Sequence, residues 1–169
     1  MTENWRLIEI GNGKQGINGR WRVTPRGLSI FLHGSDHSYD WLHHVVVLAG
    51  WRERKWARRI ADIFEVGDDI DVYIGCHSLG VAVAVPLAVI MQARGHVVRV
   101  FGFGGKQSSV RPGKLRHTTF YRRRGDIVPL LMPWRWWYRG SQVFGEWLLF
   151  WRAHEPREYA EKIKEHGFD

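Results

Sequence analysis

The sequence predicts an α/β fold in which a mostly parallel sheet is flanked by helices. Apolar and β-branched runs of strand length alternate along the chain with segments of helical length. Around residues 70–94, one such run is followed by a short turn and then by a long Val/Ala/Leu segment. With 169 residues and a mass of 19.8 kDa, the chain is long enough to enclose one core. We therefore expect a single α/β domain over residues 1–169.

The composition is that of a soluble globular chain, with 44% apolar and 25% charged residues. A single cysteine excludes an intrachain disulfide, and the first residues lack the apolar core of a signal peptide, so we expect a cytoplasmic location. The net charge is +8 and the pI is near 10.1, which favours anionic partners such as a phospholipid surface. Apart from this charge, no motif supports nucleic-acid binding.

The N-terminal half predicts an antiparallel ribbon, a strand and a helix. Residues 5–10 and 21–24 have strand composition and flank a loop that holds three glycines, so we expect a two-stranded ribbon at the edge of the sheet. Residues 28–32 predict a compact apolar strand, and residues 51–65 predict an amphipathic helix. The apolar positions that share one face of this helix are Trp56, Ile60, Ile63 and Phe64.

The C-terminal half predicts the central strand, a long buried helix and further strands. Residues 70–74 form a β-branched and aromatic run that predicts a buried strand. The apolar segment up to Arg94 predicts a buried helix because of its length and alanine content, although its valines alternate as in a strand. Residues 96–103 and 117–122 predict two more strands, and a terminal helix is expected to begin at Pro156.

The turn between the central strand and the long helix carries a serine. Ser78 lies in the stretch C-H-S-L-G, residues 76–80. Strand, sharp turn and helix with a serine at the apex are the context of a nucleophile elbow, which raises the hydroxyl above the sheet. The turn also leaves the backbone N–H of Leu79 at a helix N-terminus, where negative charge is stabilised. An ordinary turn serine is the alternative.

A serine nucleophile needs a base and an oxyanion site, and the loops after the predicted strands contain suitable residues. In a parallel sheet these loops meet at the carboxyl ends of the strands. The first contains Ser35, the second Ser78 and the third Asp126. Two histidines lie downstream of the aspartate. We predict His154 as the base because it lies in a loop, whereas His166 falls in the last turn of the terminal helix.

The order of these motifs resembles the class 3 lipase family. Residues 31–41, F-L-H-G-S-D-H-S-Y-D-W, are similar to its oxyanion-loop signature, and residues 76–80 resemble its G-H-S-L-G elbow. F-G-F-G at residues 101–104 and G-D-I-V-P at residues 125–129 are similar to the strand end and the acidic loop that follow, and His154 matches the late histidine. The resemblance implies a small α/β-hydrolase fold.

The resemblance also implies a function and a role for each residue. It implies hydrolysis of carboxylic esters, most of all lipid or phospholipid esters, through an acyl-serine intermediate. Ser78 would be the nucleophile, His154 the general base and then acid, and Asp126 the orienting carboxylate. The backbone N–H groups of Ser35 and Leu79 would form the oxyanion hole.

Three positions differ from the family pattern. His33 stands where the family has arginine, and Cys76 and Val81 replace two glycines.

One alternative function remains open. The chain could be a basic, tryptophan-rich module that binds membranes or nucleic acid and whose hydrolase site has decayed. A dense group of side chains around the first loop could instead hold a metal, but it lacks a fixed ligand spacing such as H-E-x-x-H, so we expect neither a metal nor a cofactor. The members of this group are His33, Asp36, His37, Asp40, His43 and His44.

Two apolar segments bear on membrane contact. Residues 72–93 carry no formal charge and are long enough to cross a bilayer, but polar residues divide them, so a strand followed by a helix explains them better. The sequence holds ten tryptophans, and residues 130–151 are especially rich in aromatic side chains without predicting a definite element. Within them we expect Trp134, Trp136 and Trp137 to dock on anionic lipid. We expect Trp147, Leu148, Leu149 and Phe150 to pack in the core.

Overall fold

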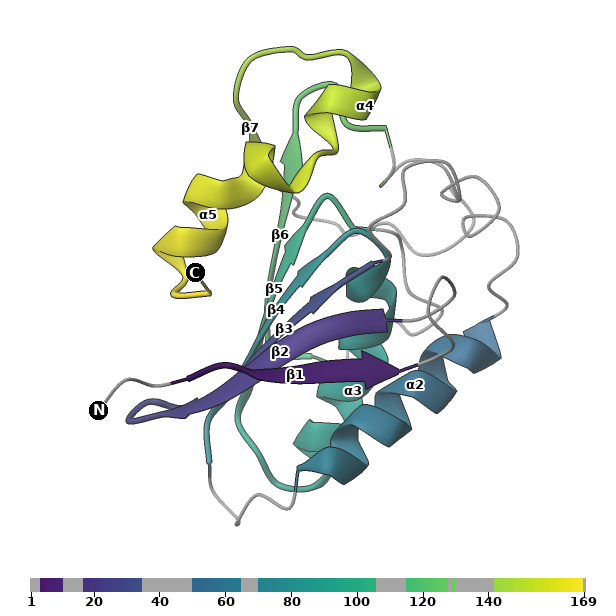
Figure 1. Cartoon of the computed structure of the whole chain (residues 1–169), viewed down its shortest axis with the longest axis vertical. Coiled ribbons are helices and arrows are strands. Elements are labelled where there is room, and N and C mark those ends of the chain that lie inside the picture. Colours follow the sequence, from purple (N-terminus) through teal and green to yellow (C-terminus); the bar gives the residue numbers. More distant parts are fainter. Residues whose placement is uncertain are drawn as a thin grey trace.

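The computed structural model describes residues 4–10, 17–34, 50–64, 70–105, 115–127, 129 and 142–168. They form a seven-stranded sheet with helices on both faces (Figure 1). The strands are β1 (Arg6–Ile10), β2 (Ile17–Thr24), β3 (Gly27–His33), β4 (Val72–His77), β5 (Val98–Phe103), β6 (His117–Arg123) and β7 (Gln142–Phe144). The helices are α2 (Gly50–Ile63), α3 (Leu79–Ala93), α4 (Phe150–Ala153), the 3₁₀ helix η4 (Pro156–Tyr159) and α5 (Ala160–Glu165).

The strands lie in the sheet in the order in which they follow one another in the chain, from β1 to β7. The pairs β1–β2 and β2–β3 are antiparallel, and every later pair is parallel. The predicted edge ribbon and the mostly parallel sheet are therefore both confirmed. Helices α2 and α3 follow β3 and β4 and lie on the same face (Figure 1), so each crossover adds the next strand on the same side of the last one.

The central strand lies further along the chain than predicted. It covers Val72–His77 rather than residues 70–74, so the turn comes directly at Ser78. Residues 79–93, in which valines alternate as in a strand, form helix α3. Helix α3 is buried almost all round, and a helix in that setting needs no polar face.

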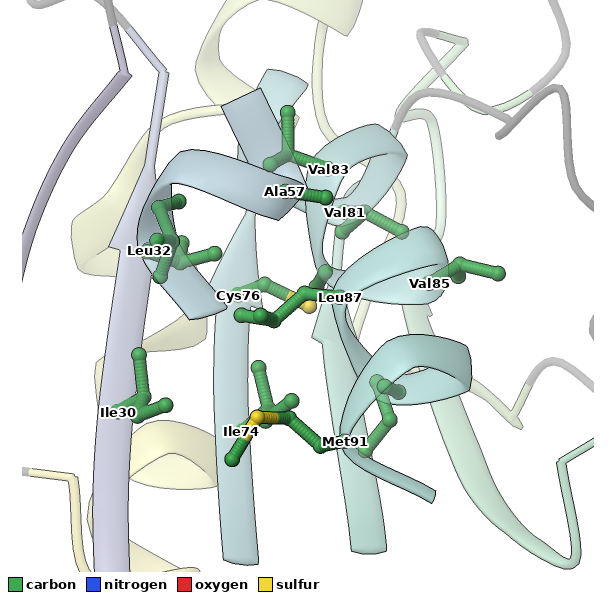
Figure 2. Packing of buried hydrophobic residues seen from close by; sticks show 14 of the residues in the cluster. Ile30, Leu32, Ala57, Ile74, Cys76, Val81, Val83, Val85, Leu87 and Met91 are labelled. Atoms are coloured by element: carbon green, nitrogen blue, oxygen red, sulfur yellow. The ribbon is translucent and has the colours of Figure 1, made fainter. Parts of the chain in front are cut away.

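One face of the sheet holds the aliphatic core beneath α2 and α3. Alternate residues of β3 and β4 point into it, including Ile30, Ile74 and Cys76, and meet Leu87 and Met91 of α3 (Figure 2). The buried side of α2 also includes Glu53, Ala57 and Ala61.

Ile63, by contrast, is exposed and does not share the buried face predicted for it. The buried stripe of α2 passes through Ala57 and Ala61, which places Ile63 at its margin.

The opposite face is aromatic and is covered by the C-terminal segment. Phe31, Phe103, Tyr121, Tyr159 and Phe168 form its buried cluster. Gly75 makes room for this segment, because a Cβ there would lie 2.8 Å from the Phe168 ring. Arg20 of β2 donates a hydrogen bond of 2.6 Å to the carbonyl of Phe168, so the chain end is fixed to the N-terminal ribbon.

The segment between β7 and α4 is more exposed than predicted. Trp147 and Leu149 were expected in the core, but 73% and 59% of their surfaces are exposed, and Leu148 is half-buried. Neither β7 nor α4 was assigned from the sequence, because these short elements lie in a run of aromatic residues without clear periodicity. None of the helices in the described residues has the length and apolar character needed to span a bilayer.

Candidate active site

Ser78 occupies the sharp turn between β4 and α3. Its φ and ψ are 54° and −124°, and it is the one non-glycine residue with a positive φ among the described residues. Such a backbone conformation costs about 1–3 kcal/mol and persists because the surrounding structure enforces it. Here the Ser78 N–H donates to the carbonyl of Phe103 at 3.1 Å, and α3 begins at the next residue. The serine is thereby held at the carboxyl edge of the sheet.

Two glycines allow the end of β3 to pack against the start of α3. A Cβ at Gly80 would lie 2.4 Å from the carbonyl oxygen of Leu32, so no larger residue fits there. A Cβ at Gly34 would lie 3.3 Å from the backbone nitrogen of Leu79. The chain therefore passes the N-terminus of α3 immediately before Ser35, which itself lies outside the described residues.

The packing explains how the chain accommodates two residues where the related pattern has glycine. The Cys76 side chain points into the aliphatic core beneath α3 (Figure 2), where its thiol contacts the carbonyl of Phe101 at 3.4 Å. Burial raises the pKa of this thiol well above its ordinary value, so it stays protonated. Val81 fills space that Gly105 leaves free, since a Cβ at Gly105 would come within 2.1 Å of its side chain.

A chain of hydrogen bonds joins the three predicted catalytic residues. Ser78 Oγ lies 2.9 Å from His154 Nε2, and His154 Nδ1 lies 3.2 Å and 3.1 Å from the two carboxylate oxygens of Asp126. An ionised carboxylate only accepts, so the imidazole proton belongs on Nδ1 and leaves Nε2 free to accept from the serine hydroxyl. Asp126 is fully buried, whereas His154 is partly exposed. The arrangement can take a proton from Ser78.

Tyr159 is a site residue that the sequence did not reveal. Its hydroxyl donates to Asp126 Oδ2 at 2.5 Å and accepts from the backbone N–H of Arg123 at 3.0 Å. Burial, and then the negative charge of Asp126, raise the pKa of Tyr159 far above its usual value, so the phenol keeps its proton. Tyr159 and Ile163 are spaced in the sequence to share one face of the terminal helix, a pattern that indicates packing but not this hydrogen bond.

From the sequence, His77 is expected to point away from the serine into the packing, and it is indeed buried, but its contact with His154 could not be predicted. Its Nε2 lies 3.1 Å from the carbonyl oxygen of His154, and the two imidazole rings stack with their centres 5.1 Å apart. Burial, followed by repulsion from His154, lowers the pKa of His77 to about 3. His77 is therefore neutral at ordinary pH, and its Nε2–H donates to the backbone of the predicted base.

The Leu79 backbone N–H lies at the first residue of α3, beside Ser78. His166 lies apart from the serine: its Nε2 is 2.8 Å from the Tyr121 hydroxyl and its ring stacks on Phe101, and burial lowers its pKa. Within the part of the chain that the structure describes, no group of three or more metal-ligating side chains is present. Of the alternative metal cluster, all members except His33 lie outside the described residues.

No family model and no curated protein matches the sequence. Solved structures of fungal and other lipases are nevertheless similar to it. The LIP2 lipase of Yarrowia lipolytica, in its nonglycosylated form, superposes with a TM-score of 0.58 at 15% identity, over 83% of this chain and 66% of the lipase. M37 lipase gives 0.58 at 12% identity, over 99% of this chain and 70% of that one. Lipase II of Rhizopus niveus gives 0.55 at 10% identity, over 84% and 67%.

The chain thus spans about two thirds of the length of these lipases, and just under two thirds, 66%, in the first comparison. At such low identity the similarity concerns the arrangement of the backbone alone. The protein has a lipase-like α/β-hydrolase fold.

Proposed function

We propose that this protein is a serine hydrolase that cleaves carboxylic esters, most of all lipid or phospholipid esters, through an acyl-serine intermediate. The observation that carries the proposal is the hydrogen-bond chain from Ser78 through His154 to Asp126, built on a strained turn at the start of a helix. These groups supply what a serine needs to act as a nucleophile: an adjacent base and a carboxylate that orients the base.

In the first half-reaction, Ser78 Oγ attacks the ester carbonyl carbon while its proton passes to His154 Nε2. The imidazolium that forms is stabilised by Asp126, which keeps its own negative charge. When the tetrahedral intermediate collapses, the bond to the alcohol oxygen breaks and His154 returns the proton to that oxygen. The alcohol leaves, and the acyl group remains on Ser78.

In the second half-reaction, water repeats the sequence. His154 takes a proton from the water as it attacks the acyl carbon, and the same proton then returns to Ser78 Oγ. The carboxylic acid is released and the enzyme is regenerated. In both steps the negative charge on the carbonyl oxygen would be stabilised by the Leu79 N–H, with the Ser35 N–H as the second donor of the oxyanion hole.

A fluorophosphonate probe followed by peptide mapping tests the proposal, because this reagent labels a serine only when the serine is activated. We expect labelling at Ser78 and none in Ser78→Ala. We expect Ser78→Ala to lose about 10⁴-fold or more in kcat on a soluble p-nitrophenyl ester. The matched control is Ser29→Ala, which removes a buried serine from the neighbouring strand β3 and should leave labelling intact.

The histidine assignment has its own control. His154→Ala should abolish labelling, whereas His166→Ala should retain it, since His166 bonds to Tyr121 and not to the serine. If Ser78→Ala hydrolyses the ester as fast as the parent and circular dichroism shows both to be folded, the hydrolase proposal is wrong. The competing interpretation, a binding module with a decayed site, would then stand.

A further inference from the structure

Two apolar side chains in the turn between β7 and α4 are exposed to solvent and do not pack into the core. Trp147 is 73% exposed and Leu149 is 59% exposed, although strand β7 before them and helix α4 after them are both parts of the fold. Burial of apolar side chains stabilises a protein, so the exposure of both residues leaves a large apolar surface in contact with water. We name these two residues the apolar pair.

The backbone fixes the apolar pair beside the candidate active site. Between its two members, the Leu148 N–H donates to the carbonyl of Arg124 at 3.3 Å. A Cβ at Gly125 would lie 2.1 Å from the Leu148 carbonyl oxygen, so the segment passes directly against the turn that ends in Asp126. In Figure 1 the segment arches beyond the carboxyl end of β6, at the end of the molecule where the strand loops meet.

Two exposed basic residues adjoin the apolar pair, one through a backbone contact and one in the helix that follows. Arg124 and Arg152 are exposed, and neither forms an ion pair with an acidic group among the described residues. Arg124 shares the backbone contact with Leu148, and Arg152 follows Leu149 in the first turn of α4. Glu146 is the single acidic residue in the turn itself, and the whole chain carries a net charge of +8. Exposed apolar side chains next to exposed arginines on a chain of positive net charge are complementary to an anionic lipid surface.

We propose that Trp147 and Leu149 insert into the headgroup region of an anionic phospholipid bilayer and dock the protein with its active-site edge toward the membrane. Tryptophan suits that region, because its ring is apolar and its indole N–H can still reach polar groups. Arg124 and Arg152 contact the phosphates. The partner is a lipid surface, which goes beyond ester hydrolysis as such, and the docking requires no turnover.

Binding is measured on the Ser78→Ala background, so that vesicle lipid is not consumed and a failure of the proposed chemistry does not affect the result. The probes are vesicles of phosphatidylcholine alone and of phosphatidylcholine mixed with phosphatidylglycerol. We expect co-sedimentation with the mixed vesicles that weakens as salt rises, because salt screens charges beyond about 10 Å at 0.1 M. We expect Trp147→Ala with Leu149→Ala to weaken binding at least about tenfold.

The matched control is Leu7→Ala with Val23→Ala, which removes two apolar side chains that are also exposed but lie on the ribbon at the other edge of the sheet. This control should bind like the parent. The Trp147/Leu149 variant should keep the parent's kcat and KM on a soluble ester, since neither side chain belongs to the hydrogen-bond chain.

Three results would overturn the proposal. The first is equal vesicle binding by the parent and the Trp147/Leu149 variant. The second is an equal loss in the Leu7/Val23 control, which would show nonspecific adsorption. The third is sedimentation equilibrium in which the parent self-associates and the Trp147/Leu149 variant is monomeric, which would show that a second copy covers the apolar pair. Urea midpoints within error of the parent establish that the variants are folded.

Discussion

At the scale of single residues, the candidate site depends on groups that adjoin the three predicted catalytic side chains. Asp126 is fully buried, and its carboxylate accepts hydrogen bonds from both His154 and Tyr159. His154 is in turn contacted on its backbone by His77. An imidazole that must accept and return a proton gains from being held in place, because small displacements of a catalytic group are costly in rate.

We predict that His77 positions His154 and does not exchange protons with the substrate. His77→Phe keeps the ring but removes the Nε2–H donor, and we expect kcat to decrease about tenfold with KM nearly unchanged, in line with the loss of one positioning contact. His77→Gln places an amide N–H near the same point and should recover most of kcat. Steady-state kinetics on a soluble ester measures both. Equal kcat values for the two variants would show that the hydrogen bond plays no part.

The same residue predicts how stability depends on pH. The pKa of His77 is about 3 in the folded protein, below the value of about 6.5 expected for an unfolded chain. Between these two pH values, His77 is protonated in the unfolded chain but neutral in the folded protein. The free energy of unfolding therefore decreases as the pH falls from about 6.5 toward about 3. His77→Gln should therefore lose less stability than the parent between pH 7 and pH 5, by about 1–2 kcal/mol. Urea unfolding at both pH values tests this, and parallel losses would contradict it.

At the scale of elements, the C-terminal segment closes the site from the aromatic face. Tyr159, the last residue of η4, joins Asp126 to the backbone at the end of β6. The helix η4, which follows His154 in the chain, therefore also holds Asp126 in place through Tyr159. Strand β4 contributes to both sides of the sheet: Cys76 points to the aliphatic core, and His77, one residue later, points to the aromatic face where His154 lies.

We expect Tyr159→Phe to be folded but less stable and less active. The ring keeps its place in the aromatic cluster, while the Arg123 N–H loses its acceptor and Asp126 loses a donor. Leaving such buried groups unsatisfied costs about 1–3 kcal/mol in the free energy of unfolding. Without the Tyr159 hydroxyl, the Asp126 carboxylate should orient His154 less well, and kcat should decrease. A matched control is Tyr73→Phe, which removes a hydroxyl bonded to Asp71 at the other end of β4. Tyr159→Phe with the parent's stability and kcat would refute the assignment.

At the scale of the whole molecule, the two faces of the sheet are covered by different parts of the chain. The aliphatic face is covered by α2 and α3, which follow the strands directly in the chain (Figure 1). The aromatic face is covered by the last residues of the chain, which return to the ribbon formed by β1 and β2. Arg20 and Arg22 donate to the carbonyls of Phe168 and Gly167, and the Phe168 ring packs on Phe31. The C-terminal residues therefore complete a core that begins with the N-terminal ribbon.

Removal of the Phe168 ring should destabilise the whole protein. Phe168 is fully buried, and truncation of a buried phenylalanine to alanine costs about 3–5 kcal/mol in the free energy of unfolding. The urea midpoint of Phe168→Ala should fall accordingly. Fluorophosphonate labelling of Ser78 should be lost at the same urea concentration as the fold, because η4 and the site share this face. Leu7→Ala, at an exposed apolar position, is the control and should leave the midpoint unchanged. An unchanged midpoint for Phe168→Ala would mean that the C-terminal segment does not close the core.

The residues predicted for the site are those that the structure brings together, apart from Ser35, which lies outside the described residues. Ser78 and Asp126 could be predicted because each follows a strand that the sequence specifies locally, and because parallel strands bring their carboxyl ends to one edge. His154 was predicted from its place in the loop before the terminal helix. Their catalytic roles stay a prediction. The tryptophans 134, 136 and 137, predicted to dock on lipid, also lie outside the described residues.

The sequence by itself determined the local elements: the apolar strands, the amphipathic α2, the elbow at Ser78 and the edge ribbon. Tertiary structure alone decided the hydrogen bonds of His77 and Tyr159, whose partners lie 77 and 33 residues away in the chain. It also decided that Trp147 and Leu149 are exposed. Periodicity reports the conformation of a segment, because backbone preferences are local. Burial and hydrogen bonding depend on which distant segments pack against a side chain, and no local pattern specifies that.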